Sequence, residues 1–369
     1  MSNINYIPWV EKYRPKKMDD LTQDEKLMNL FKNFISSGDI SHLLLYGPPG
    51  TGKTSAILAI GREIFKEHFS TRVIEFNASD DRGINAVREK ITNEAKKFVT
   101  ATVSADGTPI PSYKIIILDE ADSMTDEAQD ALRVIIEKYS TVTRFCFICN
   151  YICKITDAIK SRCYSIYFKK LDIECMINKL RSVADTEKIT IEDETLDIIV
   201  DVSNGDMRKA IMMLQNLKYL SDLKKVCRKN PEKMTRSELK ALYMIMKTKK
   251  NDTKEIHISE KDVYNIFAYV DNATIGDLLN RIFDAKSVLD LSKLSKQIIA
   301  LGYPVDNVMI QINTVLIASD DITDIQKAKI MKYTGDIYYK MKMSANEYIQ
   351  LLDYVTCING VCKGYGLFG

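Results

Sequence analysis

The stretch LLLYGPPGTGKTSAI, residues 43–57, decides the fold. An apolar run typical of a strand ends at a glycine-rich turn, and the helix-forming run that follows carries Lys53 and Thr54. Residues 47–54 match the pattern G-x-x-x-x-G-K-[ST], in which backbone N–H groups at a helix N-terminus cradle a phosphate chain. The residues of this loop that are predicted to bind the cofactor are Gly47, Pro48, Pro49, Gly50, Thr51, Gly52, Lys53, Thr54 and Ser55.

A second apolar stretch, KIIILDE at residues 114–120, ends in two acids. The carboxyl ends of parallel strands meet at one edge of a sheet, so Asp119 is expected beside a Mg²⁺ ion that the Thr54 hydroxyl also binds. Glu120 is then placed to polarise an attacking water. The alternative is that both acids only cap the next helix. Together with the phosphate-binding loop (P-loop) at residues 47–54, the pair predicts nucleotide hydrolysis.

The chain from residue 1 to residue 171 alternates apolar strands with amphipathic helices, which predicts an open α/β domain with a parallel sheet. Residues 73–76 and 143–150 are further predicted strands, and residues 100–112 are predicted to form an exposed loop. Asn150 ends a strand where its amide could hold the γ-phosphate or the attacking water. Arg162 is either a surface salt-bridge partner or a finger that points at a neighbour's nucleotide.

Composition limits the other functions. With 369 residues, two or three domains are expected, and 46% hydrophobic with 28% charged residues is typical of a globular protein. A formal net charge of +2 excludes an overall basic protein but permits a local basic surface. We find neither a signal-peptide core nor an apolar run of about 18 residues, so an intracellular protein without a membrane span is expected.

The eight cysteines are expected to be reduced. Cys146 and Cys149 should face opposite sides of one strand, which favours core cysteines over a zinc site. Cys357 and Cys362 are interpreted in the same way.

The remaining chain is predicted to be helical. Residues 172–256 begin with a predicted lid of about three short helices, broken near residues 188–190 and 203–206. A basic stretch then covers residues 221–256, either as a solvated face or as an extension that contacts DNA or a partner. Residues 257–369 are again apolar and helical, with a break at residues 302–304.

Seven motifs occur in one order: PWVEKYRPKKMDDL, GPPGTGKTS, FNASDDRGI, IIILDEADSMT, RFCFICN, SRC and NGDMRKAI. They resemble the small subunits of replication factor C, the sliding-clamp loader. The resemblance implies an AAA+ ATPase domain over residues 1–171, a helical lid over 172–256 and an all-α collar over 257–369. It also implies a hetero-pentamer that uses ATP and Mg²⁺ to load a PCNA-like clamp onto primer–template DNA, in the nucleus or at a viral replication site.

The same resemblance implies roles for individual residues. Val10 and Arg14 lie nearest the adenine, whereas Trp9 contacts the base or only anchors the N-terminal arm. Asn150 senses the γ-phosphate, Arg208 reports the nucleotide to the lid, and Arg162 is the finger that reaches the adjacent subunit.

DNA contacts are implied for Arg82 and Arg88 on the helix after NASDDRG, although Arg82 could instead pair with Asp80 or Asp81. Ile91, Phe98 and Val99 are either clamp contacts or a buried helix face.

Two other functions compete with clamp loading. One is membership of an alternative or checkpoint clamp loader, or of another ring-remodelling adaptor. The other is a catalytically dead scaffold, which the intact Lys53, Asp119, Glu120 and Arg162 argue against.

Overall fold

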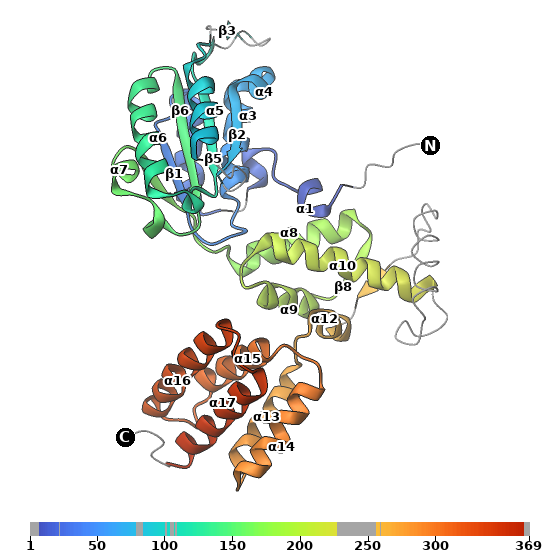
Figure 1. Cartoon of the computed structure of the whole chain (residues 1–369). Coiled ribbons are helices and arrows are strands. Elements are labelled where there is room, and N and C mark those ends of the chain that lie inside the picture. The colour runs from blue at the N-terminus through green and yellow to red at the C-terminus, as the bar shows by residue number, and fades with distance from the viewer. Residues whose placement is uncertain are drawn as a thin grey trace. The chain divides into compact units, whose positions relative to one another are not determined.

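The structure, a computed structural model, describes residues 7–21, 23–78, 84–99, 102–103, 107, 109–226, 256–258 and 260–364 (Figure 1). The chain forms two compact units, residues 1–257 and 258–369.

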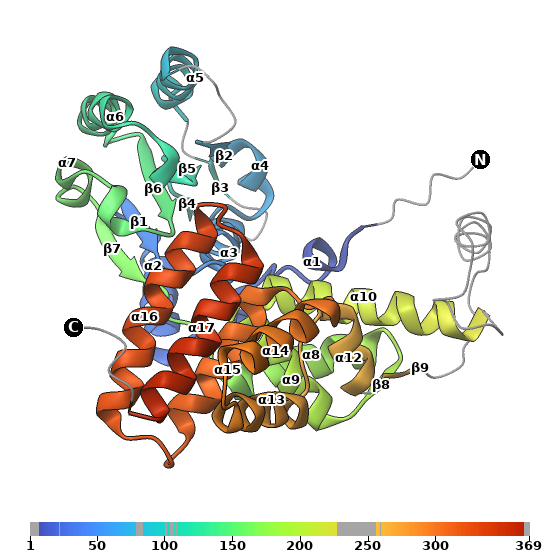
Figure 2. The same cartoon turned by 60° about the horizontal axis from the view of Figure 1, so that its bottom comes forward.

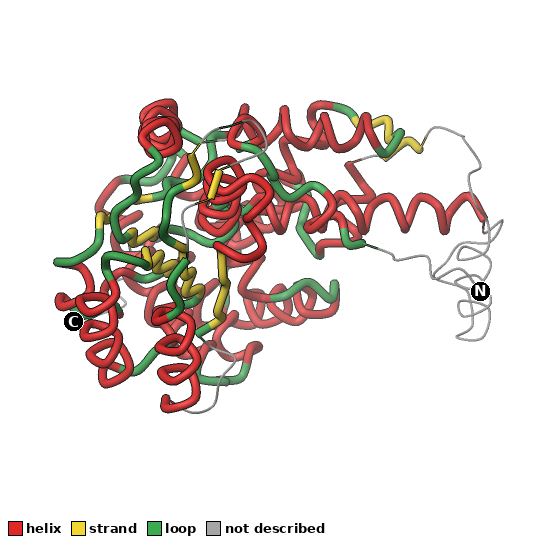
Figure 3. Tube along the Cα trace, turned by 90° about the horizontal axis from the view of Figure 1, so that it is seen from above, coloured by secondary structure: helices red, strands yellow, loops and turns green. Residues whose placement is uncertain are grey.

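The first unit is built on a five-stranded sheet in the order β2-β5-β6-β1-β7, and all neighbouring strands run parallel. Figure 3 colours the strands of the chain yellow. The predicted α/β domain with a parallel sheet is therefore confirmed. The strands are β1 (Leu43–Tyr46), β2 (Val73–Asn77), β5 (Lys114–Asp119), β6 (Thr143–Cys149) and β7 (Tyr164–Tyr167).

Helices cover both faces of this sheet (Figure 2). Leu43 and Leu45 pack with α2 (Glu25–Ser37) and α3 (Lys53–Phe65), whereas Leu44 packs with the helices on the other face. Cys146 and Cys149 belong to the cores on opposite faces, as their spacing predicts. The helices of the second face are α5 (Ile84–Lys96), α6 (Asp126–Tyr139) and α7 (Asp157–Lys160).

Short elements connect these layers. They are α1 (Trp9–Lys12), α4 (Phe69–Arg72), β3 (Thr102–Val103), β4 (Pro109–Ile110), and the 3-10 turns η1 (Met18–Asp20), η2 (Lys66–His68), η3 (Ala121–Ser123) and η4 (Ile152–Lys154).

The prediction of a plain exposed loop over residues 100–112 is wrong. Thr102 and Val103 pair antiparallel with Ile110 and Pro109. Ile110 is 4% exposed and packs in the core beneath α2 and α3, so an apolar side chain anchors this segment.

The lid consists of α8 (Ile173–Thr186), α9 (Asp193–Ser203) and α10 (Met207–Val226), and β8 (Ile189–Ile191) pairs with β9 (Ile256–Ile258). The predicted breaks fall where Lys188 and Asn204 adopt positive φ angles of 58° and 55°. The expectation of short helices fails for α10, which has 20 residues and continues into the basic stretch. The rest of that stretch, residues 227–255, lies outside the described residues.

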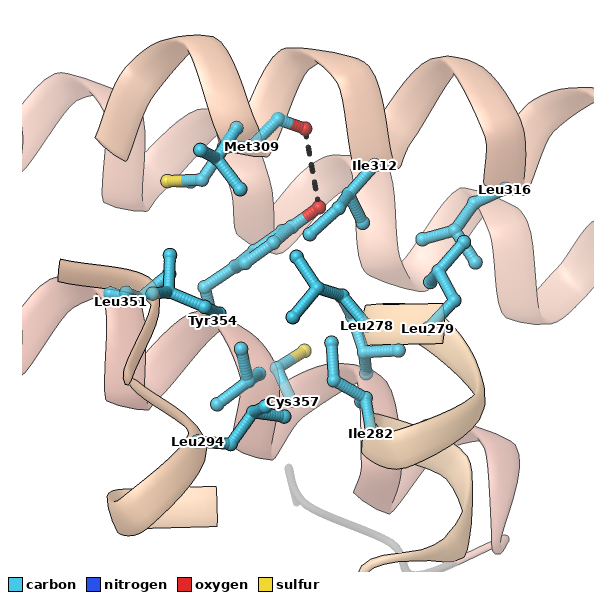
Figure 4. Close-up of a cluster of buried hydrophobic side chains, with 14 of the residues drawn as sticks. Leu278, Leu279, Ile282, Leu294, Met309, Ile312, Leu316, Leu351, Tyr354 and Cys357 are labelled. Carbon is cyan, nitrogen blue, oxygen red and sulfur yellow. Dashed lines mark hydrogen bonds between the residues drawn. The ribbon is translucent and has the colours of Figure 1, made fainter. Parts of the chain in front are cut away.

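The described part of the second unit is helical, as predicted. Tyr354 of α17 lies in its core, and its hydroxyl donates to the Met309 carbonyl at 3.4 Å and to Asn313 Oδ1 at 2.8 Å (Figure 4). Cys357 is buried in the same core and Cys362 packs against it. The predicted break at residues 302–304 separates α14 from α15. The helices are α12 (Glu260–Phe267), α13 (Asn272–Asp284), α14 (Val288–Ala300), α15 (Val305–Ala318), α16 (Asp324–Lys342) and α17 (Glu347–Cys362).

No helix within the described ranges is both long and apolar enough to cross a bilayer.

Candidate nucleotide site

One cavity brings together the N-terminal arm, the P-loop, the strand ends and the lid, all within the first unit. The arm, which we define as residues 8–15, contributes one wall, and α8 and α10 of the lid contribute another. The lining includes Val10, Tyr13, Arg14, Gln23, Pro49, Gly50, Thr51, Gly52, Lys53, Thr54, Ser55, Asp119, Glu120, Asn150, Lys179, Met207, Arg208 and Ile211.

Lys53 opens α3 and is 6% exposed. Its ammonium donates to the carbonyls of Gly47 at 2.7 Å and Pro48 at 2.8 Å, and to Asn150 Oδ1 at 3.0 Å. Burial lowers the pKa of Lys53, and the nearby Asp119 carboxylate acts in the opposite direction. Gly47 and Pro48 thus hold the lysine through their carbonyls, whereas Pro49 through Ser55 line the cavity itself.

The two predicted metal ligands lie in contact. The Thr54 hydroxyl, in the first turn of α3, donates to Asp119 Oδ2 at 2.9 Å, and Asp119 ends β5. Hydroxyl and carboxylate oxygens are the hard donors that Mg²⁺ prefers, so the pair fits this ion.

Glu120 follows Asp119 in a left-handed conformation with a φ of 55°. Such a backbone costs free energy in a non-glycine residue, and it turns the chain sharply at the strand end. The Glu120 side chain is exposed and lines the cavity. Beside it, Asp122 Oδ2 accepts the N–H groups of Asn150 and Tyr151 at 3.3 Å and 3.2 Å, which ties the ends of β5 and β6 together.

The lid reaches the P-loop at the start of α10. Asp206 caps that helix by accepting the N–H groups of Arg208 at 2.9 Å and Lys209 at 3.2 Å. Arg208 lines the cavity, as the prediction requires. A Cβ atom on Gly50, whose φ is +73°, would lie 1.8 Å from Asp206 Oδ1, so the close approach of lid and P-loop needs glycine there.

In the arm, Val10 and Arg14 line the cavity, and Arg14 Nε donates to Ser55 Oγ at 3.4 Å. Trp9 lies on the lid side instead. It is buried, its backbone N–H donates to Gln215 Oε1 at 3.2 Å, and Lys218 Nζ lies 5.2 Å from its ring centroid. These contacts anchor the arm to the lid, and a contact of Trp9 with the base stays a prediction.

Arg162 lies away from the described lining of this cavity. Its Nε and Nη2 donate to Glu137 Oε1 at 2.8 Å and 2.5 Å, and Nη1 donates to the Ala158 carbonyl at 2.7 Å. A finger acts on a neighbouring subunit, so this role stays a prediction.

The predicted DNA residues are described only in part. Arg82 lies outside the described residues, and Arg88 lies in α5 with its side chain outside them. Of the clamp candidates beside them, Ile91 is fully buried in the core, which is the helix-face alternative. Phe98 is 86% exposed and Val99 is half-buried.

Sequence reasoning missed several residues of the cavity. Gln23 donates through Nε2 to the Thr51 carbonyl at 2.6 Å, and Lys179, Met207 and Ile211 form the lid wall. These residues belong to ordinary helical or loop patterns, so only the folded arrangement identifies them.

This fold and site define a P-loop ATPase with a helical lid. Family models match residues 43–171 as the ATPase family associated with various cellular activities, residues 178–218 as the RCF1/5-like AAA+ ATPase lid domain, and residues 270–357 as the replication factor C C-terminal domain.

Relatives that match almost the whole chain show which family of P-loop ATPases it belongs to. The chain is 58% identical to a putative replication factor C small subunit of Acanthamoeba polyphaga mimivirus, over 97% of this chain and 98% of that protein. It is 39% identical to replication factor C subunit 4 of Arabidopsis thaliana, over 95% and 94%, and 38% identical to subunit 2 of Schizosaccharomyces pombe, over 96% and 95%. The chain belongs to the replication factor C small-subunit family, and it is an ATPase subunit of a clamp loader.

Proposed function

We propose that the chain is one subunit of a hetero-pentamer that uses ATP and Mg²⁺ at this cavity to open a PCNA-like clamp and close it around primer–template DNA. The observation that carries the proposal is the convergence of Lys53, Thr54, Asp119 and Asn150 at one cavity that the lid and the arm also line.

The base end of the nucleotide lies against Val10 and Arg14 in this proposal. The phosphates lie in the loop of residues 50–54, where backbone N–H groups at the start of α3 favour negative charge. Lys53 exchanges its contacts with Gly47 and Pro48 for the β- and γ-phosphates.

Thr54 and Asp119 hold Mg²⁺, and the bound ion neutralises charge on the phosphates. Glu120 accepts the proton of the attacking water, because it follows the metal ligand and its side chain is free to face the cavity. Asn150 and Arg208 contact the γ-phosphate from the strand ends and from the lid. Both line the cavity, where the Asn150 amide and the Arg208 guanidinium can donate hydrogen bonds to phosphate oxygens.

Arg162 reaches the nucleotide of an adjacent subunit in the assembled complex. Supplied in trans, an arginine of this kind accelerates hydrolysis by roughly 10³–10⁵-fold. Hydrolysis then depends on assembly. The complex works where DNA is replicated, in a nucleus or at a viral replication site.

The test uses the co-purified native complex. Its mass gives the number and identity of the subunits, and its ATPase rate is measured alone, with clamp, with primed DNA and with both. We expect joint stimulation by PCNA-like clamp and primed DNA. If a different ring stimulated the ATPase rate, or if the clamp and primed DNA together did not, the chain would instead be assigned to an alternative or checkpoint loader.

A further inference from the structure

The N-terminal arm contacts both the cavity and the lid. Val10 of α1 lines the cavity, and so do Tyr13 and Arg14 just after the end of that helix. The Trp9 backbone N–H and the Tyr13 hydroxyl also donate hydrogen bonds to lid residues. A short segment of chain therefore joins the lid to the nucleotide site.

Glu187, at the end of α8, receives the arm. Its carboxylate accepts hydrogen bonds from Lys12 Nζ, from the Tyr13 hydroxyl at 2.6 Å and from Lys218 Nζ at 2.6 Å. Two of these donors belong to the arm and the third to α10. The Glu187 side chain is 11% exposed. Burial raises its pKa, but the donors outweigh burial and hold the pKa at about 2. The carboxylate is therefore ionised at neutral pH.

Lys218 also contacts the arm directly, because its ammonium sits above the Trp9 ring. One turn further back on α10, Gln215 accepts the backbone N–H of Trp9 at 3.2 Å and donates to the Tyr219 hydroxyl at 2.8 Å. Glu187 and Lys218 form the centre of a contact that spans α1, α8 and α10.

The same segment contacts the P-loop helix, where Arg14 Nε donates to Ser55 Oγ beside Thr54, the proposed metal ligand. A helix of four residues has too few hydrogen bonds to be stable alone. The position of Val10 and Arg14 therefore depends on the contacts that hold the rest of the arm.

We propose that Glu187 is a positioning residue for the nucleotide site: it fixes the arm to the lid and thereby holds Val10 and Arg14 against the base end of the nucleotide. This inference rests on the proposed nucleotide site. It adds that the arm and the lid move as one body, so that a lid displaced from the P-loop takes Val10 and Arg14 with it.

An exposed ion pair would not hold the arm against the lid, because exposed ion pairs contribute little to stability. Glu187 differs by its burial and by its three donors. The lid offers a matched control in Asp193, a carboxylate that is 76% exposed and pairs with Arg181 at 2.5 Å.

The test compares Glu187→Gln with Asp193→Asn in the full-length chain. Trp9 is the only tryptophan in the sequence, so its fluorescence and its quenching by acrylamide report docking of the arm directly. Binding of a fluorescent ATP analogue to the chain, and steady-state ATPase kinetics of the assembled complex that contains each variant, complete the comparison. For Glu187→Gln we expect stronger quenching of Trp9 and nucleotide affinity weakened by about tenfold, since charged hydrogen bonds to the arm are lost.

Because Lys53 and Glu120 are untouched, KM should rise while kcat at saturating ATP stays near the wild-type value. Asp193→Asn should leave every readout unchanged. Lys12→Met, which removes one donor from the exposed side, should shift the same readouts less, and should add nothing when combined with Glu187→Gln. Lys12→Met decides the matter if Glu187→Gln unfolds.

If Glu187→Gln and Lys12→Met both kept the Trp9 quenching and the nucleotide affinity of the wild type, the inference would be overturned. An equal change in Asp193→Asn would overturn it too, because that result would indicate general loosening of the lid. Failure of the wild-type chain to bind ATP would instead refute the proposed nucleotide site.

Discussion

Replacing Lys53 with Ala tests the phosphate site most directly, and the size of the expected loss in ATP affinity follows from the contacts of the lysine. Hydrogen bonds to a charged group contribute about 1.5–3 kcal/mol each, so two contacts to phosphate oxygens give about 3–6 kcal/mol. Part of this is offset, because the ammonium must first leave Gly47, Pro48 and Asn150. We therefore expect the lower end, a loss of about 3 kcal/mol or roughly 100-fold in ATP affinity.

The assay is calorimetric titration of ATP with Mg²⁺ into the full-length chain, with far-UV circular dichroism to verify the fold. The matched control is Lys169→Ala, which removes a 70% exposed lysine that meets Asp24 at 3.4 Å. The control should bind ATP as the wild type does. A Lys53→Ala protein whose affinity stays within threefold of wild type, or that keeps normal steady-state hydrolysis, would refute the reasoning.

Three further outcomes are expected. Glu120→Gln should bind ATP normally and trap it, because the binding groups remain while the water loses its base; inability to bind ATP would instead give Glu120 a structural role. Arg82→Ala combined with Arg88→Ala should weaken binding of the complex to primed DNA equally for all sequences. It should also lower the slope of log affinity against log salt by roughly one per lost phosphate contact. The ATPase rate without DNA should not change, and an unchanged slope would show that the DNA contact lies elsewhere. Burial, with the nearby Arg144, lowers the pKa of His42 to about 4, so the folded state favours the neutral imidazole. The urea concentration at the unfolding midpoint should therefore decrease as the pH is lowered from 6.5 to 4. His42→Asn should flatten this dependence, and a wild-type midpoint that does not change with pH would contradict the assignment.

The sequence predicts the phosphate end of the site because the rules there are local. A G-x-x-x-x-G-K-[ST] loop requires a strand before it and a helix after it, and β1 and α3 are those elements. Parallel strands bring their carboxyl ends to one edge, which is why Asp119 and Asn150 meet Thr54 and Lys53. Residue type, spacing and strand direction were sufficient for these contacts.

The lid wall and the arm could not be derived in this way. Glu187 lies at the end of an ordinary amphipathic helix, and its partner Lys12 is 175 residues away. The hydrophobic periodicity of the two segments does not predict that pairing. The hairpin at Ile110 was missed for a related reason, because one buried side chain outweighs the turn-like composition around it. Contacts between distant segments depend on three-dimensional packing, which a reading along the chain does not provide.

The ion pair of Arg162 with Glu137 is compatible with the proposed finger. Its side chains are 32% and 52% exposed, and an exposed pair of this kind contributes about 0–1 kcal/mol. A finger in trans accelerates hydrolysis by roughly 10³–10⁵-fold, which corresponds to about 4–7 kcal/mol of transition-state stabilisation. The pair with Glu137 can therefore open on assembly at little cost, and the stabilisation by the finger is realised when the transition state forms. Until then, Glu137 keeps the guanidinium on the surface of α6.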